Sequence, residues 1–288
     1  MNPRYPLYIV SKGRADTRMT SKALERMGVP YSIVVEEQEA DVYRAVIDPA
    51  KILILDPAYQ RNYDTCDDLG ESKSKGPGAA RNFAWDHSIA QGATSHWVMD
   101  DNIAHFFRLN QNLKILMECG TGFYAMEEFC DRYYNVAMAG PQYDFFVPRK
   151  KRVAALVLNT RIYSCNLIRN NLPFRWRGRY NEDTDLSLRL LKAGWVTVLF
   201  NSFLQKKMPT QIVPGGCMTD FYAKEGTGPK SRMQVALHPD VSKLVYRFGR
   251  IHHYVDYRSF RRNNRLRRRP DVVINGPDEF GMTLQAVP

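Results

Sequence analysis

Through the first half of the chain, short apolar runs alternate with amphipathic segments, and this alternation constrains the fold more than any other feature. The runs at 6–10, 31–37, 51–56 and 95–99 have the length and composition of strands, whereas 20–28 and 79–92 have helical patterns that end at glycine. Strands that alternate with helices predict an α/β fold with a mostly parallel central sheet flanked by helices. Because ligands bind such sheets at the carboxyl ends of the strands, residues 11–14 and 100–102 are expected on one rim.

The second half of the chain predicts further elements in a less regular order. We expect an amphipathic helix over 122–140, paired strands over 152–159 and 161–170, a helix over 181–194 and a strand over 195–202. Glycine and proline residues predict a mobile loop over 213–232. We divide the chain into a main domain of residues 1–240 and a basic C-terminal extension of residues 241–288.

The net charge of +11 on 288 residues is the compositional feature that bears most on function. Such an excess favours an anionic partner, and nucleic acid, a nucleotide or a membrane surface are the candidates. Seven arginines lie between residues 258 and 269, and phosphate contacts of the kind they make dominate nonspecific affinity for nucleic acid. A solvated basic helix face is the alternative explanation of these arginines.

Cysteine usage and hydropathy predict a cytoplasmic protein. The five cysteines are widely spaced and form no CxxC pair, which argues for reduced thiols and against a zinc site. The first apolar run is too short for a signal peptide, and no run approaches the roughly 18 apolar residues of a membrane span. We therefore expect no membrane partner.

Two clusters of acidic residues stand at predicted element ends. The apolar run 97–99 stops at Asp100, Asp101 and Asn102, and neighbouring carboxylates disfavour each other's ionised form. Either a solvated turn or a bound cation explains them, since Mg²⁺ and Mn²⁺ prefer carboxylate and phosphate oxygens. Glu182, Asp183 and Asp185 form the second cluster at a helix start. One explanation is structural, because the helix dipole favours acidic side chains at a helix start. The other is functional, with one of these carboxylates as a general base that activates a hydroxyl group.

Two further segments carry positive charge. A glycine-rich turn opens the helix at 79–92, so its backbone N–H groups face an anion, and Lys75 and Arg81 add charge there. The loop 173–180 interleaves arginines with aromatic residues, an arrangement suited to stacking on an acceptor and neutralising it.

Taken in order, these motifs resemble nucleotide-sugar-dependent glycosyltransferases of the GT-A fold, and more closely the TET-associated glycosyltransferases of phages. The likeness runs from Tyr8 to about Tyr257 through the segments YIVSKGRADTR, GPGAARN, VMDDN, NEDTDLSLRLLKAGW and RFGRIHHYVDY. It implies a GT-A-like nucleotide-sugar-binding fold. It also implies an enzyme that transfers a sugar from a UDP-sugar to the hydroxyl of 5-hydroxymethylcytosine, or a related hydroxymethylpyrimidine, in phage DNA. A divalent cation, Mn²⁺ or Mg²⁺, and an inverting reaction with a carboxylate base come with the resemblance.

The resemblance also assigns roles to individual residues. Asp183 would be the general base, with Glu182 beside it. The metal would be held by Asp101 or Asn102 and by one of His252 and His253, which the C-terminal extension supplies. The nucleotide sugar would contact Ser11, Lys12, Gly13, Arg14, Lys75, Arg81, Asp100 and Asp101. DNA would contact Arg175, Trp176, Arg177, Arg261, Arg262, Arg265, Arg267 and Arg268.

Two other functions fit parts of the same sequence. One is a GT-A enzyme that acts on a protein or glycan, and the other is a noncatalytic nucleic-acid-binding protein whose acidic clusters are structural. The basic tail and the basic aromatic loop favour DNA over a protein or glycan acceptor. The two acidic clusters favour an enzyme over a binding protein. The sequence leaves open whether the sugar is a hexose or an N-acetylhexosamine.

Overall fold

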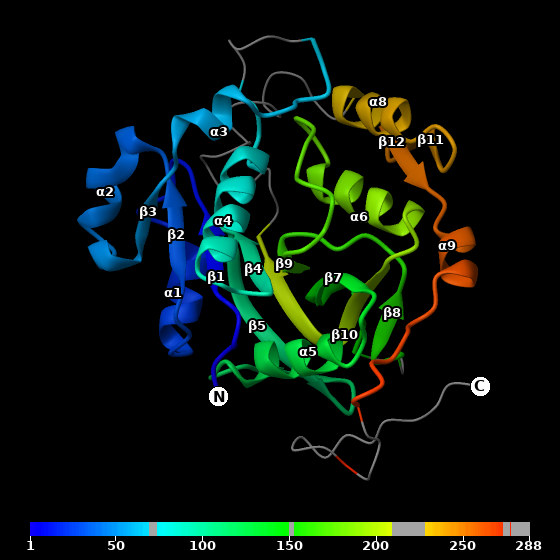
Figure 1. The fold of residues 1–288 in the computed structure, drawn as a ribbon, viewed down its shortest axis with the longest axis horizontal. Helices are drawn as coiled ribbons and strands as arrows, with labels where there is room; N and C mark the ends of the chain where they lie inside the picture. The colour runs from blue at the N-terminus through cyan, green and yellow to red at the C-terminus, as the bar shows by residue number, and fades with distance from the viewer. Residues whose placement is uncertain (69–73, 150–152, 209–227, 273–276, 278–288) are drawn as a thin grey trace.

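The computed structural model describes residues 1–68, 74–149, 153–208, 228–272 and 277. Its larger sheet has the strand order β3-β2-β1-β4-β9-β7-β10-β5-β6, with β8 paired to β10 (Figure 1). These strands are β1 Leu7–Val10, β2 Ser32–Val35, β3 Ile52–Ile54, β4 Ser95–Asp100, β5 Ile103–Asn110, β6 Leu113–Leu116, β7 Val136–Tyr143, β8 Leu156–Leu158, β9 Cys165–Arg169 and β10 Val196–Lys207.

The helices on this sheet are α1 Met19–Arg26, α2 Ala40–Arg44, α3 Pro57–Arg61, α4 Gly78–Ala90, α5 Thr121–Asp131 and α6 Glu182–Lys192. Towards the C-terminus follow α8 Gly228–Leu237, the hairpin of β11 Ser242–Arg247 and β12 Arg250–Val255, and α9 Arg258–Asn263. The predicted α/β fold class, with a central sheet flanked by helices, is confirmed. Strands β3, β2, β1 and β4 pair in parallel, as do β7 and β10, and the other pairs are antiparallel.

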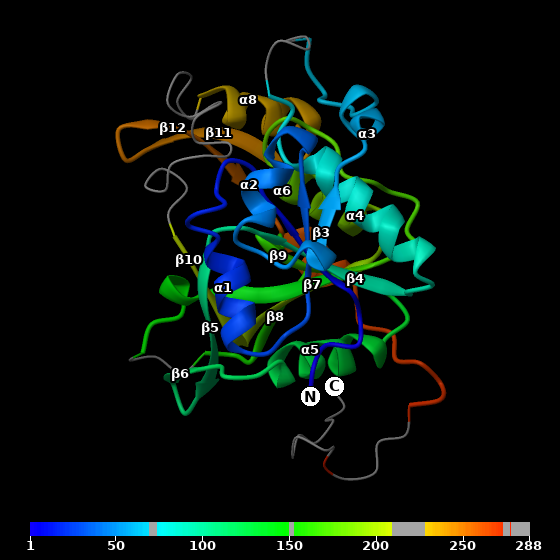
Figure 2. The ribbon, with the colours of Figure 1, turned by 90° about the vertical axis from the view of Figure 1, so that its left-hand side faces the viewer.

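The two faces of the sheet follow from the two-residue period of the central strands. On β1 and β4, Leu7, Ile9, Trp97 and Met99 belong to one buried cluster, which α1 and α5 cover. The intervening Tyr8, Val10 and Val98 belong to a second cluster, which α4 and α6 cover. Figure 2 shows α4 and α5 on opposite sides of the sheet. The central strands are therefore buried on both faces and hold their carboxyl ends rigidly.

The predicted helix over 122–140 is wrong in its second half. The helix α5 ends at Asp131, and residues 136–143 form β7 in the middle of the sheet. Residues 136–141 are buried on both faces of the sheet, so this run lacks the two-residue alternation that marks a strand. Gly140 fits this position because an added Cβ would lie 2.2 Å from the carbonyl oxygen of Cys165.

The predicted pairing of 152–159 with 161–170 is also wrong. Strand β8 pairs with β10, whereas β9 lies between β4 and β7. Strand β9 is buried at four of its five positions and takes a central place, so it parts from its neighbour in sequence. The predicted loop over 213–232 is wrong from residue 228 onwards, where α8 begins, and its earlier part lies outside the described residues.

The C-terminal segment packs on the main domain in two places. Phe260 of α9 joins Leu188 and Leu191 of α6 in a small buried cluster. Beyond α9, the Nδ2 of Asn135 donates to the carbonyl of Arg265 at 2.8 Å, just before β7 begins. In Figure 1 this orange-red segment runs from α9 to the end of the molecule where the N-terminus lies. The division at residue 240 stays a prediction.

Candidate active site

A cleft of about 670 Å³ opens where the carboxyl ends of β1, β2, β4, β7 and β10 meet the first turns of α4 and α6. The prediction that residues 11–14 and 100–102 share one rim is confirmed, because the hydroxyl of Ser11 donates to Oδ2 of Asp101 at 2.7 Å. Five acidic side chains line the described part of the cleft: Glu36, Asp100, Asp101, Glu182 and Asp183. Nine basic side chains also line it: Lys12, Arg14, Arg61, Lys75, Arg81, Arg161, Arg179, Lys207 and Lys230. The excess of positive charge suits an anionic ligand.

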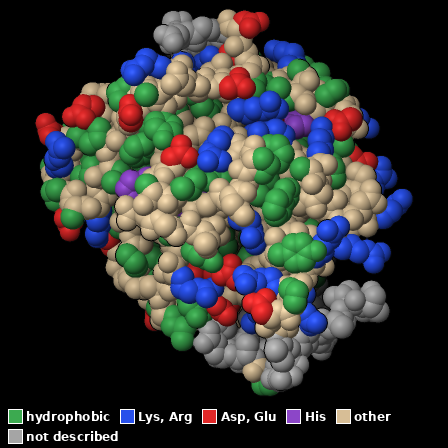
Figure 3. Space-filling model, in the orientation of Figure 1, with side chains coloured by type: hydrophobic (Ala, Val, Ile, Leu, Met, Phe, Trp, Pro, Cys, Tyr) green, Lys and Arg blue, Asp and Glu red, His purple; other side chains and the backbone are tan. Residues whose placement is uncertain are grey.

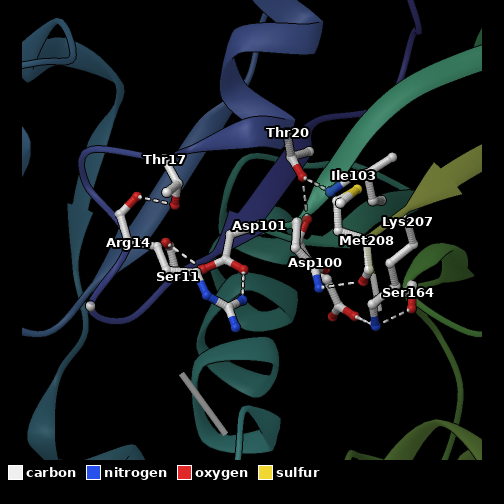
Figure 4. A network of polar contacts seen from close by, with 12 residues as sticks. Ser11, Arg14, Thr17, Thr20, Asp100, Asp101, Ile103, Ser164, Lys207 and Met208 are labelled. Carbon is white, nitrogen blue, oxygen red and sulfur yellow. Dashed lines mark hydrogen bonds and ion pairs between the residues drawn. The ribbon is translucent and has the colours of Figure 1, made fainter. Parts of the chain in front are cut away.

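The two aspartates at the end of β4 point to opposite sides (Figure 4). Asp101 accepts hydrogen bonds from Ser11 and from the guanidinium of Arg14, and burial raises the pKa of Asp101 although Arg14 opposes this. Asp100 accepts from Nζ of Lys207 at 2.6 Å and from Nη2 of Arg81 at 2.6 Å. Burial opposes ionisation of Asp100, but Lys207 and Arg81 hold its pKa well below the usual range. Both carboxylates are thus engaged by side chains of the protein.

The described side chains of this cleft do not form a preassembled set of ligands for a resident divalent cation. Among the described residues, no group of three or more His, Cys, Asp and Glu side chains comes together as metal ligands. The buried Oδ1 of Asn102 has no hydrogen-bond partner in the part of the chain that the structure describes, and as a metal ligand it would be neutral. His253 lines the cleft, and burial and the nearby charges of Lys230 and Arg161 lower its pKa to about 4, so its imidazole is neutral at pH 7. That is the form that binds a metal, but the charges of Lys230 and Arg161 repel a cation. His252 lies off the cleft, beside Arg250. The divalent cation therefore remains a prediction that follows only from the family resemblance.

The glycine-rich turn places Arg81 under the cleft floor. Arg81 is 2% exposed, forms ion pairs with Asp100 and Glu182, and stacks its guanidinium 4.6 Å from the ring centre of Trp176. The Nε of Arg81 makes no hydrogen bond within the described residues. The first turn of α4 lines the cleft beside it, so free backbone N–H groups and a fixed guanidinium meet at one place. This arrangement suits a phosphate group.

The turn allows no side chain at Gly78. A Cβ added there would lie 1.8 Å from the hydroxyl of Tyr63, which donates to the carbonyl of Gly178 at 2.9 Å. We expect Gly78→Ala to lower the free energy of unfolding by about 1–3 kcal/mol, the usual cost of overpacking. Urea denaturation measures this loss. In a Tyr63→Ala background the same substitution should cost much less, and an equal cost in both backgrounds would contradict the steric explanation.

The acidic cluster at the start of α6 divides into three different environments. The Oδ1 of Asp183 accepts from the backbone N–H of Thr184 at 2.7 Å, and its Oδ2 makes no hydrogen bond within the described residues. Glu182 pairs with Arg81, and burial together with the charge of Asp183 raises its pKa to about 7, although Arg81 opposes this. Asp185 lies away from the cleft, fully buried against Arg177, Arg189 and His238. Asp183 alone combines a fixed carboxylate with an open oxygen at the cleft.

The other predicted nucleotide contacts are mostly at the cleft. Lys12 lines it and pairs with Glu36 at 3.1 Å, and Lys75 lines it while donating to the carbonyl of Gln60. Gly13 is not among the lining residues, and its N–H donates to Glu39 at 2.7 Å. These contacts leave the assigned roles as predictions.

The prediction that Trp176 stacks on the acceptor is wrong for this structure. Trp176 is 2% exposed and packs inside the second buried cluster, under Arg81. Its neighbours Arg175 and Arg177 form ion pairs with Asp86 and Asp185. These ion pairs hold Arg175 and Arg177 against the protein, whereas Arg179 and Tyr180 of the same loop line the cleft.

The predicted DNA-binding arginines of the tail lie at two separate places. Arg261 and Arg262 are exposed on α9, and Figure 3 shows basic side chains gathered there. Arg265, Arg267 and Arg268 are exposed near the start of β7, whereas the last residue of β7, Tyr143, lines the cleft. Eight strand residues separate the two ends, about 25 Å. A short stretch of DNA bound at the cleft would therefore reach the arginines of α9 more readily than Arg265, Arg267 and Arg268.

The sequence patterns did not point to several residues that line the cleft. Lys207 ends β10, Ser164 precedes β9, and Arg161, Tyr163 and Lys230 come from segments without a motif. The hydroxyl of Ser164 accepts from Lys207 at 2.8 Å, so these residues complete the surroundings of Asp100. The predicted strand ends at residue 202, whereas β10 continues to Lys207, so the sequence pattern did not mark this lysine as the end of a strand.

A cationic cleft at the carboxyl ends of the strands of an α/β sheet is typical of enzymes that bind anionic ligands such as nucleotides. The model of the TET-Associated Glycosyltransferase family matches residues 5–216, and the chain belongs to this family. Among solved structures, a mannose-1-phosphate geranyltransferase from Thermus thermophilus is similar, with 11% identity and a TM-score of 0.32. That match covers 81% of this chain but only 64% of the other. A search of curated proteins finds no match. No helix in the described part of the chain is long and apolar enough to span a membrane.

Proposed function

We propose that this enzyme transfers a sugar from a UDP-sugar to the hydroxyl of 5-hydroxymethylcytosine, or a related hydroxymethylpyrimidine, in DNA. The observation that carries the proposal is the carboxylate of Asp183. One of its oxygens is fixed by Thr184, and the other makes no hydrogen bond within the described residues, in a cleft lined by nine Lys and Arg side chains. A fixed carboxylate opposite an anion site is what a single displacement needs. The family supports sugar transfer, and the net charge of +11 supports DNA as acceptor.

In the proposed step, the acceptor oxygen attacks the anomeric carbon of the sugar. A bond forms between these atoms while the bond from the anomeric carbon to the diphosphate oxygen breaks, and the diphosphate leaves with that electron pair. Asp183 takes the proton of the acceptor hydroxyl. Positive side chains around the leaving group stabilise the charge that develops on it. Arg81 is suited to stabilise the leaving group, because Asp100 and Glu182 fix its position and its Nε makes no hydrogen bond within the described residues.

The test is incubation of the purified protein with a panel of UDP-sugars and duplex DNA that contains cytosine, 5-hydroxymethylcytosine or 5-hydroxymethyluracil. Nucleoside mass spectrometry should show one added hexosyl or N-acetylhexosaminyl group on a hydroxymethylated nucleoside and none on cytosine. Sugar transfer to a protein or glycan, with none to any DNA, would contradict the proposal. Parallel reactions with EDTA, Mn²⁺ or Mg²⁺ test the metal. We expect donor binding to persist in EDTA because cleft side chains supply the charge.

A further inference from the structure

A second cavity, of about 370 Å³, adjoins the cleft. Arg161, Tyr163 and His253 line both spaces, so they form the wall between them. The second cavity continues over Tyr257 and Arg261, near the start of α9. Its volume lies at the lower end of the roughly 300–1,000 Å³ of small-ligand sites.

The shared wall is held in place by the protein. The hydroxyl of Tyr163 donates to Oε1 of Gln142 at 2.7 Å, and the guanidinium of Arg161 lies 5.0 Å from the ring centre of Tyr163. The ring of Tyr143 packs against Tyr163 with 4.4 Å between ring centres. An aromatic ring fixed in this way offers a rigid surface to a flat ligand.

Tyr257 and His253 line this cavity, and each carries a buried polar atom that has no hydrogen-bond partner within the described residues. These atoms are the hydroxyl of Tyr257 and Nδ1 of His253. Buried polar groups in folded proteins are nearly always paired, so an unpaired couple in one cavity points to a polar ligand. A nucleobase carries ring nitrogens and exocyclic groups that can satisfy both.

The cavity also lies next to the proposed base. Asp183 lines the cleft together with the three wall residues. Burial raises the pKa of Tyr257, and the charge of Asp183 adds to this although Arg161 opposes it. Outside, Arg261 lines the cavity, and Arg258 and Arg262 are exposed on the same short helix.

We propose that this second cavity is the acceptor site, where one nucleotide turned out of the DNA places its base against Tyr163 and Tyr257 and its phosphates against Arg261 and its neighbours. The inference rests on the proposed function and replaces Trp176 as the acceptor contact. Turning a base out of a duplex costs a few kcal/mol. A cavity with a fixed ring, two unpaired polar atoms and a cationic rim supplies contacts that offset this cost.

The first experiment compares Tyr257→Phe with Tyr246→Phe. Tyr246 lies on β11 of the neighbouring hairpin, is 74% exposed and does not line the cavity. We expect Tyr257→Phe to raise the KM for hydroxymethylated DNA about tenfold, the effect of losing one good hydrogen bond, while UDP-sugar affinity by calorimetry stays unchanged. Tyr246→Phe should match the wild-type protein. Equal KM values for the two variants would overturn the acceptor site.

A second experiment measures DNA binding without turnover. A duplex with 2-aminopurine beside the hydroxymethylated base should gain fluorescence on binding, because an expelled base unstacks its neighbour. Tyr257→Phe should reduce this signal, and Arg261→Gln should lower the salt dependence of binding by about one phosphate contact. If the signal is lost in Tyr257→Phe but no sugar is ever transferred, the cavity stands and the proposed function fails. If wild-type protein transfers sugar and neither variant changes binding, the function stands and the cavity assignment fails.

Discussion

Replacing Asp183 with asparagine is expected to lower the turnover of sugar transfer about 10²–10⁴-fold, the usual contribution of a general base. The amide keeps the size of the side chain, and its oxygen can still accept the hydrogen bond from the N–H of Thr184. It cannot take the proton of the acceptor hydroxyl. Steady-state kinetics should show the loss in kcat, and calorimetry should show unchanged UDP-sugar affinity.

Glu182→Gln is the matched control for this variant. Glu182 is the preceding residue on the same turn, but its carboxylate is paired with Arg81, which we propose to face the phosphates of the donor. We expect it to change donor affinity more than kcat. If Asp183→Asn keeps near-full activity and Glu182→Gln loses it, the base is Glu182 and the assignment made from the open oxygen of Asp183 is wrong.

Asp185→Asn should have the largest effect on stability. Asp185 is fully buried and accepts from Arg177, Arg189 and His238, so the amide leaves the guanidinium groups of Arg177 and Arg189 without their counter-charge. Breaking one partner of a buried ion pair costs about 3–5 kcal/mol. Urea denaturation at pH 7 should show this loss for Asp185→Asn and little change for Asp183→Asn. A loss below about 1 kcal/mol would show that the network adds little to the fold.

The same network predicts a pH dependence. Burial opposes ionisation of Asp185, but the hydrogen bonds from His238 and Arg177 and the charge of Arg189 lower its pKa to about 2, against an ordinary value of 3.8. A lowered pKa means that the folded protein favours the ionised form. This stabilisation is complete above about pH 4 and is lost as the pH falls towards 2. Stability curves of wild-type protein and Asp185→Asn should therefore converge in that range.

Sequence and structure agree best where a motif is short and stands at the end of an element. Asp100 follows an unmistakable buried run, and Asp183 opens a helix whose apolar period is clear. Both side chains line the cleft, because strand ends and helix starts of an α/β sheet gather on one rim. They disagree on the loop 173–180. A row of arginines and aromatic residues has the same composition whether its arginines bind a ligand or form ion pairs within the protein, and only the partners Asp86 and Asp185 reveal the ion pairs.

By itself the sequence determined the fold class, the family resemblance and the place of the two acidic clusters, because periodicity and chain punctuation are local properties. The tertiary structure decided which charges meet. Lys207 lies 107 residues after Asp100 in the sequence, and the antiparallel pairing of β10 with β5 brings the two together. Asp100, which was predicted to contact the nucleotide sugar, therefore pairs with a lysine of the protein. It also decided that Trp176 is buried and that the tail divides between α9 and the far end of β7. Such pairings follow from packing between distant segments, and no local pattern records them.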